Sequence, residues 1–314
     1  MKKTPLYNLH QKHGAKFVQF AGYEMPIQYE TGIVKEHITT RNNSGIFDVS
    51  HMGQLFLKGG DELTNDLQKI FPIDLAKISI NRPDKKNSLT GHMYKTMDDA
   101  FKEARKREDI KVVHLCGEGG IFSAGNDITS FANANPNTVS DETEVMGFLY
   151  EISSFPKPIV AEVSGLAVGV GVTCLLHCDF VYAERETKFS LPFVKLGLCP
   201  EAASTLILPR ISGYLKAAEK LLLGDNFNAV DALDMGIVTR IFKAAELSGA
   251  VKSTCDKLIS LPSNSLRISK KFLKSEIKEG MKERMKEEGD MLWRLLNSDE
   301  AKEAFANFKS KKPA

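Results

Sequence analysis

One stretch, Pro158 to Ser204, constrains the fold more than any other part of the chain. It opens with an apolar run at residues 158–163, and a turn containing Gly165, Gly169 and Gly171 follows. Gly169 and Gly171 allow a tight turn with room for a ligand beside the backbone. The turn leads into a short apolar helix, where free backbone N–H groups point outward and favour negative charge. The stretch therefore predicts a place that holds an anion, or an oxygen that becomes one during a reaction.

The composition is that of an ordinary globular protein and excludes several classes of function. The 314 residues are 42% apolar and 26% charged, and the net charge of +2 gives no reason to expect a nucleic-acid partner. No apolar run is long enough to span a membrane, so we expect no membrane partner. The five cysteines are an odd number without framework spacing, which indicates reduced thiols and a cytoplasmic location. We expect Cys174 and Cys178 to be buried small side chains rather than metal ligands, and we expect no metal site.

Strands and helices alternate along the chain, which indicates an α/β fold. Strands are expected at residues 78–80, 111–116 and 180–183, with a helix between the first two. The apolar side chains of that helix recur at helical spacing and are Met93, Met97, Ala100, Phe101 and Ala104.

Two later segments have distinct local signals. The polar run from Asn133 to Thr143 predicts a mobile loop beside the ligand pocket. From Pro262 onward the pattern is helical, and Ser298 followed by acidic residues predicts the cap of a last helix.

Several motifs in a fixed order resemble the crotonase (enoyl-CoA hydratase/isomerase) superfamily, from about residue 78 to the C-terminus. They lie at residues 81–83, 87–89, 122–128, 165–171, 178–179 and 229–238. The resemblance implies a spiral core of strand–strand–helix units at 78–260 and a helical C-terminal region at 261–314. It also implies a homotrimer or hexamer, although packing within one chain would explain the apolar stripes of the last helices equally well.

In that family two backbone N–H groups hold a thioester oxygen as it becomes an enolate. The resemblance places them at Asn126 and Val170, each after a glycine. It implies further substrate contacts at Ser123, Ala124, Gly125, Asp127 and Gly169. A dinucleotide-binding turn is the competing interpretation of the second loop, but Cys174 stands where its third glycine should be.

The carboxylates decide which reaction is expected. Hydratases of the family use two glutamates, and their positions are occupied here by Thr173 and Phe193, which cannot exchange protons near neutral pH. A carboxylate stands instead at Glu201, and residues 196–204 resemble the Δ3,Δ2-enoyl-CoA isomerases, in which one glutamate moves a proton from C2 to C4. From spacing alone, Glu201 after Pro200 could equally be a solvated residue at a helix start.

The substrate itself carries the only non-protein group that the resemblance requires. Coenzyme A is part of an acyl-CoA substrate, and a proton shift is redox-neutral, so no separate cofactor is expected. Lys85 and Lys86 lie at the family's nucleotide-contact segment, and Lys270 and Lys271 are further candidates for the phosphates. Solvated lysines are the alternative at all four positions.

Residues 1–77 differ from the rest and resemble the N-terminal part of the glycine-cleavage T-protein, a folate-dependent aminomethyltransferase. The similar motifs lie at residues 4–6, 20–26 and 45–53. The catalytic aspartate of that family lies beyond the matching part. We therefore expect a fragment that buries no complete core, contributes little stability and is removable. It could still supply a replacement edge for the first strand of the following domain, and the junction near Lys77 could be natural or artificial.

Together these patterns predict an isomerase that converts 3-enoyl-CoA to 2-trans-enoyl-CoA. A CoA-thioester-binding homologue with another or no activity is the first alternative. Folate-dependent aminomethyl transfer is the second, and the missing later T-protein sequence argues against it.

Overall fold

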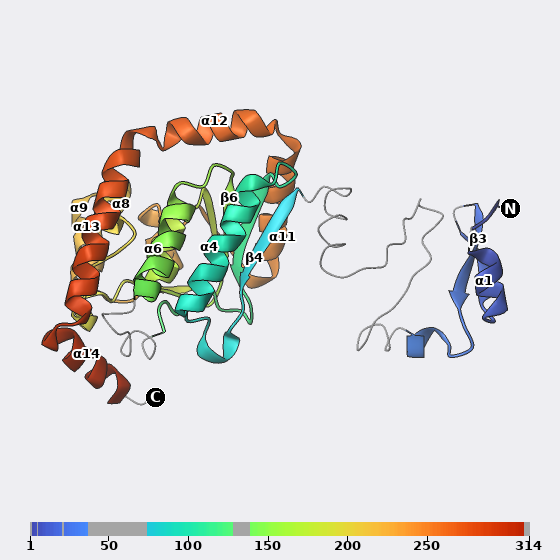
Figure 1. The fold of residues 1–314 in the computed structure, drawn as a ribbon, viewed down its shortest axis with the longest axis horizontal. Helices are drawn as coiled ribbons and strands as arrows, with labels where there is room; N and C mark the ends of the chain where they lie inside the picture. Colours follow the sequence, from blue (N-terminus) through green and yellow to red (C-terminus); the bar gives the residue numbers. More distant parts are fainter. Residues whose placement is uncertain (1, 5, 21, 37–73, 128–138, 311–314) are drawn as a thin grey trace. The chain divides into compact units, whose positions relative to one another are not determined.

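The computed structural model divides the chain into two compact units, residues 1–71 and 72–314. The structure describes residues 2–4, 6–20, 22–36, 74–127 and 139–310. Figure 1 shows the helices and strands of each unit.

The described part of the first unit is a small three-stranded sheet with one helix. Its elements are β1 (Lys2–Lys3), α1 (Tyr7–Lys12), β2 (Lys16–Phe20) and β3 (Tyr23–Gln28), and the strand order is β1-β3-β2. Among the described residues of this unit only Thr4, His10 and Met25 are buried. The motif predicted at 45–53 lies outside the described residues.

A five-stranded parallel sheet forms the centre of the second unit, with strand order β11-β8-β6-β5-β4. Its strands are β4 (Leu75–Ile80), β5 (Val112–Gly117), β6 (Ile159–Val163), β8 (Phe180–Glu184) and β11 (Arg240–Phe242). The middle strands are almost continuously apolar and buried, as expected for a parallel sheet that is covered on both faces. The first strand begins at Leu75, so it crosses the boundary that the sequence predicted after Lys77.

Helices cover both faces of this sheet. On one face α11 (Ala244–Ser260) packs its apolar side chains against β5, β6 and β8. On the other face α4 (Gly91–Lys106) and α6 (Val139–Ser153) lie side by side (Figure 1). The rings of Phe101 and Phe155 meet edge to face there, with centroids 5.1 Å apart.

The start of α6 corrects one expectation. Residues 139–143 belong to the predicted polar loop, yet they are the first residues of this helix. The remainder, 133–138, lies outside the described residues. A run of polar residues therefore did not exclude a helix here, because α6 is held by its contacts with α4 rather than by its first turn.

A second, smaller sheet carries the glycine turn. Its strands are β7 (Leu166–Val168), β9 (Lys188–Ser190) and β10 (Phe227–Asn228), in the order β10-β9-β7. Directly after β7 the chain turns at Gly169 into α7 (Val170–Thr173) and the 3-10 helix η3 (Cys174–His177). An isolated bridge between Ser123 and Ala167 brings the earlier loop beside this sheet.

The remaining elements of the second unit are α-helices and short 3-10 helices. They are η2 (Pro83–Lys85), η4 (Val194–Leu196), α8 (Ser204–Ser212), α9 (Tyr214–Leu223), α10 (Ala229–Asp234), α12 (Ser263–Leu273), η5 (Ser275–Ile277), α13 (Lys278–Leu296) and α14 (Asp299–Ser310). The last three α-helices follow one another around the edge of the unit (Figure 1). The Ser298 hydroxyl accepts a hydrogen bond from the Ala301 N–H at 3.2 Å, which confirms the predicted cap. The boundary predicted after residue 260 falls between α11 and α12. Within the described residues, no helix combines the length and the hydrophobicity needed to cross a membrane.

Candidate active site

Two glycine-containing loops form one wall of a cavity of about 510 Å³. Residues 124–126 come from the loop after β5, and residues 168–170 come from the end of β7 and the start of α7. The predicted residues Ala124, Gly125, Asn126, Gly169 and Val170 therefore line one cavity, although residues 124–126 are more than forty positions away from the others along the chain.

The close approach of the two loops explains the glycine at position 125. Gly125 has φ +82°, and a Cβ there would lie 2.6 Å from the Val168 carbonyl oxygen. Any side chain would push the loops apart. Gly169 has φ +54°, and a Cβ there would meet no described atom within 4 Å, so its side faces open space at the cavity.

The backbone N–H groups of Asn126 and Val170 are available for a ligand. Within the described part of the chain neither N–H donates a hydrogen bond to a protein acceptor. Val170 is the first residue of α7, where an N–H has no partner in its own helix. The site thus offers two free donors to an oxygen that gains negative charge.

Two of the predicted contact residues hold the first loop in place. Ser123 is buried; its hydroxyl donates to the Asn87 carbonyl at 2.8 Å and accepts from the Gly125 N–H at 3.1 Å. Asp127 accepts a 2.6 Å hydrogen bond from the Arg82 guanidinium and does not line the cavity. Arg82 was not assigned a role from the sequence, because a single arginine in a turn carries no pattern.

The predicted lysines lie outside the cavity. Lys85 and Lys86 are exposed in and after η2, and neither lines the cavity. Lys270 is buried, and its ammonium group donates to Asp179 at 2.6 Å and to the Lys157 carbonyl at 2.7 Å. Lys270 thus has a structural role, which leaves Lys271 as the exposed member of that pair.

Glu201 lies in the turn before α8, and its side chain is buried, with the residue only 3% exposed. This burial excludes the alternative of a solvated residue at the helix start. Its Oε1 atom has no hydrogen-bond partner among the described residues. Burial, reinforced by the charge of Glu288, raises the pKa of the Glu201 carboxyl to about 8.

Tyr94 links Glu201 to the cavity. The Tyr94 side chain on α4 is buried, and its hydroxyl donates a hydrogen bond to the side-chain oxygen of Asn126, which lines the cavity. Burial and then the charge of Glu201 raise the pKa of Tyr94 well above its usual value. Glu201 therefore lies within electrostatic range of Tyr94, and it is not among the residues that line the cavity. Tyr94 was not recognised from the sequence, because it follows Met93 in the helical stripe without any distinguishing motif.

Thr173 and Phe193, which stand at the positions of the two hydratase glutamates, are both buried. Phe193 lines the cavity, and Thr173 is completely buried beside it in α7. The Thr173 hydroxyl has no hydrogen-bond partner among the described residues.

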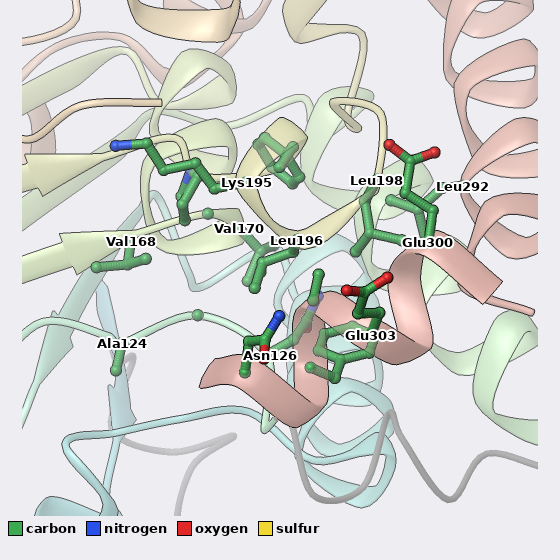
Figure 2. Close-up of a pocket in the computed structure, with 17 residues that line it drawn as sticks. Ala124, Asn126, Val168, Val170, Lys195, Leu196, Leu198, Leu292, Glu300 and Glu303 are labelled. Atoms are coloured by element: carbon green, nitrogen blue, oxygen red, sulfur yellow. The ribbon is translucent and has the colours of Figure 1, made fainter. Parts of the chain in front are cut away.

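The C-terminal helix α14 forms the opposite wall of the cavity. Glu300, Glu303 and Phe305 line it, and Figure 2 shows both carboxylates extending from this helix on the side away from Val168. Gly197 after η4 allows the close approach, because a Cβ there would lie 2.9 Å from the Ala301 backbone. The cap of α14 was predicted from the sequence but its place beside the cavity was not, since contacts between distant helices leave no local pattern.

The described residues contain no group of three or more His, Cys, Asp or Glu side chains arranged to hold a metal ion. All five cysteines are free thiols. Cys174 is buried as predicted, while Cys178 is partly exposed.

Comparisons with known proteins agree with this geometry. Residues 72–314 match the family model described as enoyl-CoA hydratase/isomerase. The chain belongs to this family. Residues 6–84 match the model of the GCVT N-terminal domain, in agreement with the T-protein resemblance of the first segment. The parallel sheet, the two loops and the helical C-terminal region are therefore those of a crotonase-type fold.

Curated relatives of the crotonase part carry isomerase names. Enoyl-CoA delta isomerase 2 from Rattus norvegicus is 36% identical over 243 residues, which cover 76% of this chain and 62% of that protein. The chain thus spans less than two thirds of this relative. Enoyl-CoA delta isomerase 3, peroxisomal, from Mus musculus is 33% identical, with 80% of this chain and 81% of that protein covered. Because that name places the mouse protein in peroxisomes, the cytoplasmic location stays a prediction for this chain.

Solved structures share the fold. A structure of OdaA from Pseudomonas aeruginosa has a TM-score of 0.73 at 37% identity and covers 76% of this chain and 96% of its own. An enoyl-CoA hydratase/isomerase from Pseudoalteromonas atlantica T6c has a TM-score of 0.72 at 37% identity, with 76% and 95% covered.

Proposed function

We propose that the second unit is an enoyl-CoA isomerase that converts 3-enoyl-CoA thioesters to 2-trans-enoyl-CoA. The observation that carries the proposal is the buried carboxyl group of Glu201, whose charge acts on Tyr94, the hydrogen-bond partner of the cavity residue Asn126, together with two free N–H donors in that cavity. The isomerase names of the relatives support the same reaction class.

In the proposed reaction the thioester oxygen accepts hydrogen bonds from the N–H groups of Asn126 and Val170. Ionised Glu201 removes a proton from C2, and the electron pair of that C–H bond becomes part of a dienolate whose charge lies on the thioester oxygen. Protonated Glu201 then returns the proton to C4, while the C3–C4 double bond moves to C2–C3. The proton and the electrons balance without a further reactant.

The pKa of Glu201 suits this double role. A group that must accept and then return a proton works best with a pKa near the operating pH. Burial and the nearby Glu288 raise the pKa of Glu201 to about 8, so both protonation states are accessible near neutral pH.

The cavity has room for the acyl chain and thioester of the substrate, but not for the whole of coenzyme A. Its volume of about 510 Å³ is within the usual range for small-molecule sites, and Leu196, Leu198 and Leu292 give it an apolar lining for an acyl chain. The nucleotide of coenzyme A would remain outside, where Lys85 and Lys86 are exposed and could meet its phosphates.

The decisive assay offers 3-enoyl-CoA and 2-trans-enoyl-CoA separately to the purified full chain. We expect isomerisation of the first and little hydration of the second, because Thr173 and Phe193 cannot activate water. Hydration at a comparable rate would overturn the isomerase assignment. CoA-thioester binding without turnover would favour the non-enzymatic homologue, and folate binding would favour aminomethyl transfer.

A homotrimer or hexamer remains part of the proposal. Exposed apolar side chains on α9 support it, since Tyr214 is 72% and Leu215 82% exposed, and the exposed Leu222 and Leu223 follow about two helical turns later. Light scattering on the purified chain measures the assembly directly, and a monomer at micromolar concentration would contradict it.

A further inference from the structure

The turn that carries Glu201 has a strained backbone and one local hydrogen bond across it, from the Ser204 N–H to the Glu201 carbonyl at 3.0 Å. Ala202 and Ala203 have φ values of +60° and +55°, a left-handed conformation that residues with a Cβ adopt only under constraint. Ala203 is also the N-cap of α8 and has no side chain that can bond the free N–H groups at the helix start. An acceptor from elsewhere must stabilise this turn.

Glu288 on α13 supplies that acceptor. Its Oε1 atom accepts hydrogen bonds from the Thr205 N–H at 3.1 Å and from the Thr205 hydroxyl at 2.5 Å. Its Oε2 atom has no hydrogen-bond partner among the described residues. Glu288 is 6% exposed and stands 83 positions from Thr205, so a distant helix caps α8.

Neighbouring contacts attach the same turn at other points. The Cys199 thiol donates to the Glu288 backbone carbonyl at 3.5 Å, and Arg284 donates to the Thr205 hydroxyl at 3.0 Å. His177 lies 2.9 Å from the Ala202 carbonyl, and burial lowers the pKa of His177 to about 3, so this imidazole is neutral and donates. The turn is therefore held between α13 and η3.

Glu288 also acts on Glu201 electrostatically. Burial first, and the charge of Glu288 second, raise the pKa of Glu201 to about 8. Burial raises the pKa of Glu288 to about 7, against the lowering effect of its bonds from Thr205.

We propose that Glu288 is a positioning residue for Glu201: it fixes the turn that presents the Glu201 carboxyl group, and it brings a second carboxyl group to that turn. Its part in turnover rests on the proposed isomerase function. Its part in the geometry and titration of Glu201 does not.

The other ionisable groups that act on Glu201 or Glu288 carry no negative charge near neutral pH. Burial raises the pKa values of Tyr94 on α4 and Cys174 in η3 far above neutrality, and burial raises the pKa of Cys199 to about 11, so all three stay uncharged. Arg284 carries a positive charge and opposes the effect of burial on Glu288. Glu288 is thus the negative charge acting on Glu201 among the described groups.

The first test titrates Glu201 directly, without substrate, in the full chain. The protein is labelled with carboxyl-¹³C glutamate, and Glu201→Gln identifies the Glu201 signal by its loss. In Glu288→Gln, which keeps the shape but loses the charge, we expect the Glu201 titration to move to lower pH by about one pH unit, the scale of ordinary environmental shifts. Glu283→Gln, at an exposed position on the same helix, should change nothing. An unchanged Glu201 titration in Glu288→Gln would overturn the proposal, whether or not the chain proves to be an isomerase.

The second test uses turnover and the hydroxyl of Thr205. Because ionised Glu201 is the base, Glu288→Gln should move the acidic limb of the kcat/KM profile to lower pH in parallel with the carbon signal. Thr205→Val should lower kcat more than it raises KM, and Thr205→Ser, which keeps the hydroxyl, should restore kcat. If Glu288→Gln does not fold, this pair of Thr205 variants still decides the positioning role, and equal kcat values for Val and Ser would refute it.

A double variant separates positioning from direct chemistry. Since Glu288 acts through Glu201, adding Glu288→Gln to Glu201→Gln should cause no further loss of turnover. A further loss comparable to the single Glu288 variant would show that Glu288 acts on the substrate by another route.

Discussion

At the scale of single residues the site depends on the difference between two acidic environments. Asp127 pairs with Arg82 at 2.6 Å and serves its loop, whereas Glu201 is buried with one oxygen unpartnered among the described residues. A carboxyl group without a partner loses its solvation and gains nothing in return, so its proton is held more tightly. That cost to the folded state is what makes the group useful as a base near neutral pH.

Glu201→Gln should abolish most of the proposed turnover. The amide keeps the size of the side chain but cannot accept the proton from C2, so kcat should fall by about 10²–10⁴-fold, the usual contribution of a general acid–base group. Binding of a CoA thioester, measured by calorimetry, should change little, because its oxygen is held by backbone N–H groups. Near-normal kcat would place the proton carrier at another residue.

The same substitution should stabilise the chain in a pH-dependent way. The pKa of Glu201 rises from its ordinary value of 4.5 to about 8 on folding, so the unfolded state releases this proton first. The contribution of the protonated group is complete below pH 4.5 and is lost as the pH rises toward 8. Glu201→Gln should therefore melt above the wild type at pH 8 and close to it at pH 4.5. Each 1 kcal/mol or so corresponds to roughly 2–4 °C in Tm for a domain of this size. A larger gain at pH 4.5 than at pH 8 would contradict the assignment of the buried carboxyl group.

At the scale of elements, helices that are distant in sequence complete the site. The loops after β5 and β7 provide the N–H donors, α4 provides Tyr94, α13 provides Glu288 and α14 provides the opposite wall. Because α14 approaches at Gly197, its position depends on the absence of a Cβ there.

Gly197→Ala should displace α14 from the cavity. The new Cβ would lie 2.9 Å from the Ala301 backbone, and the residue has φ +68°. We expect a loss of more than about 1 kcal/mol in the free energy of unfolding, since alanine at a positive φ is strained, together with a raised KM. Denaturant unfolding and steady-state kinetics measure the two effects. The control is Gly249→Ala at an exposed position of α11, where a Cβ meets no described atom, and it should be neutral or stabilising. An equal loss of unfolding free energy in this control would remove the steric explanation.

At the scale of the whole molecule the chain consists of two units that differ in burial. The described part of residues 1–71 buries few side chains, whereas the second unit has buried clusters on both faces of its sheet. Residues 6–84 match an N-terminal domain model, and residues 72–314 match the enoyl-CoA hydratase/isomerase model. Stability and the proposed activity should therefore belong to the second unit.

Two truncations test this division. Removal of residues 1–71 should leave Tm and isomerase turnover nearly unchanged, because β4 remains complete. Removal of residues 1–77 deletes Leu75, Ala76 and Lys77, which pair with Val112, Val113 and His114 of β5, so it should lower Tm measurably. Scanning calorimetry compares the two proteins. Loss of the fold in the shorter truncation would show that the first segment is integral.

The sequence by itself determined the elements and the chemistry that is absent. Glycines at 125 and 169, the alternation of strands and helices and the Ser298 cap are local patterns, and local conformation obeys them. The identities of Thr173 and Phe193 alone show that the two hydratase glutamates are absent. Only the tertiary structure decided the burial of Glu201, the bond from Tyr94 to Asn126 and the capping of α8 by Glu288. The physical reason is that desolvation and tertiary hydrogen bonds depend on which distant side chains meet, and periodicity records only which face of each element is apolar.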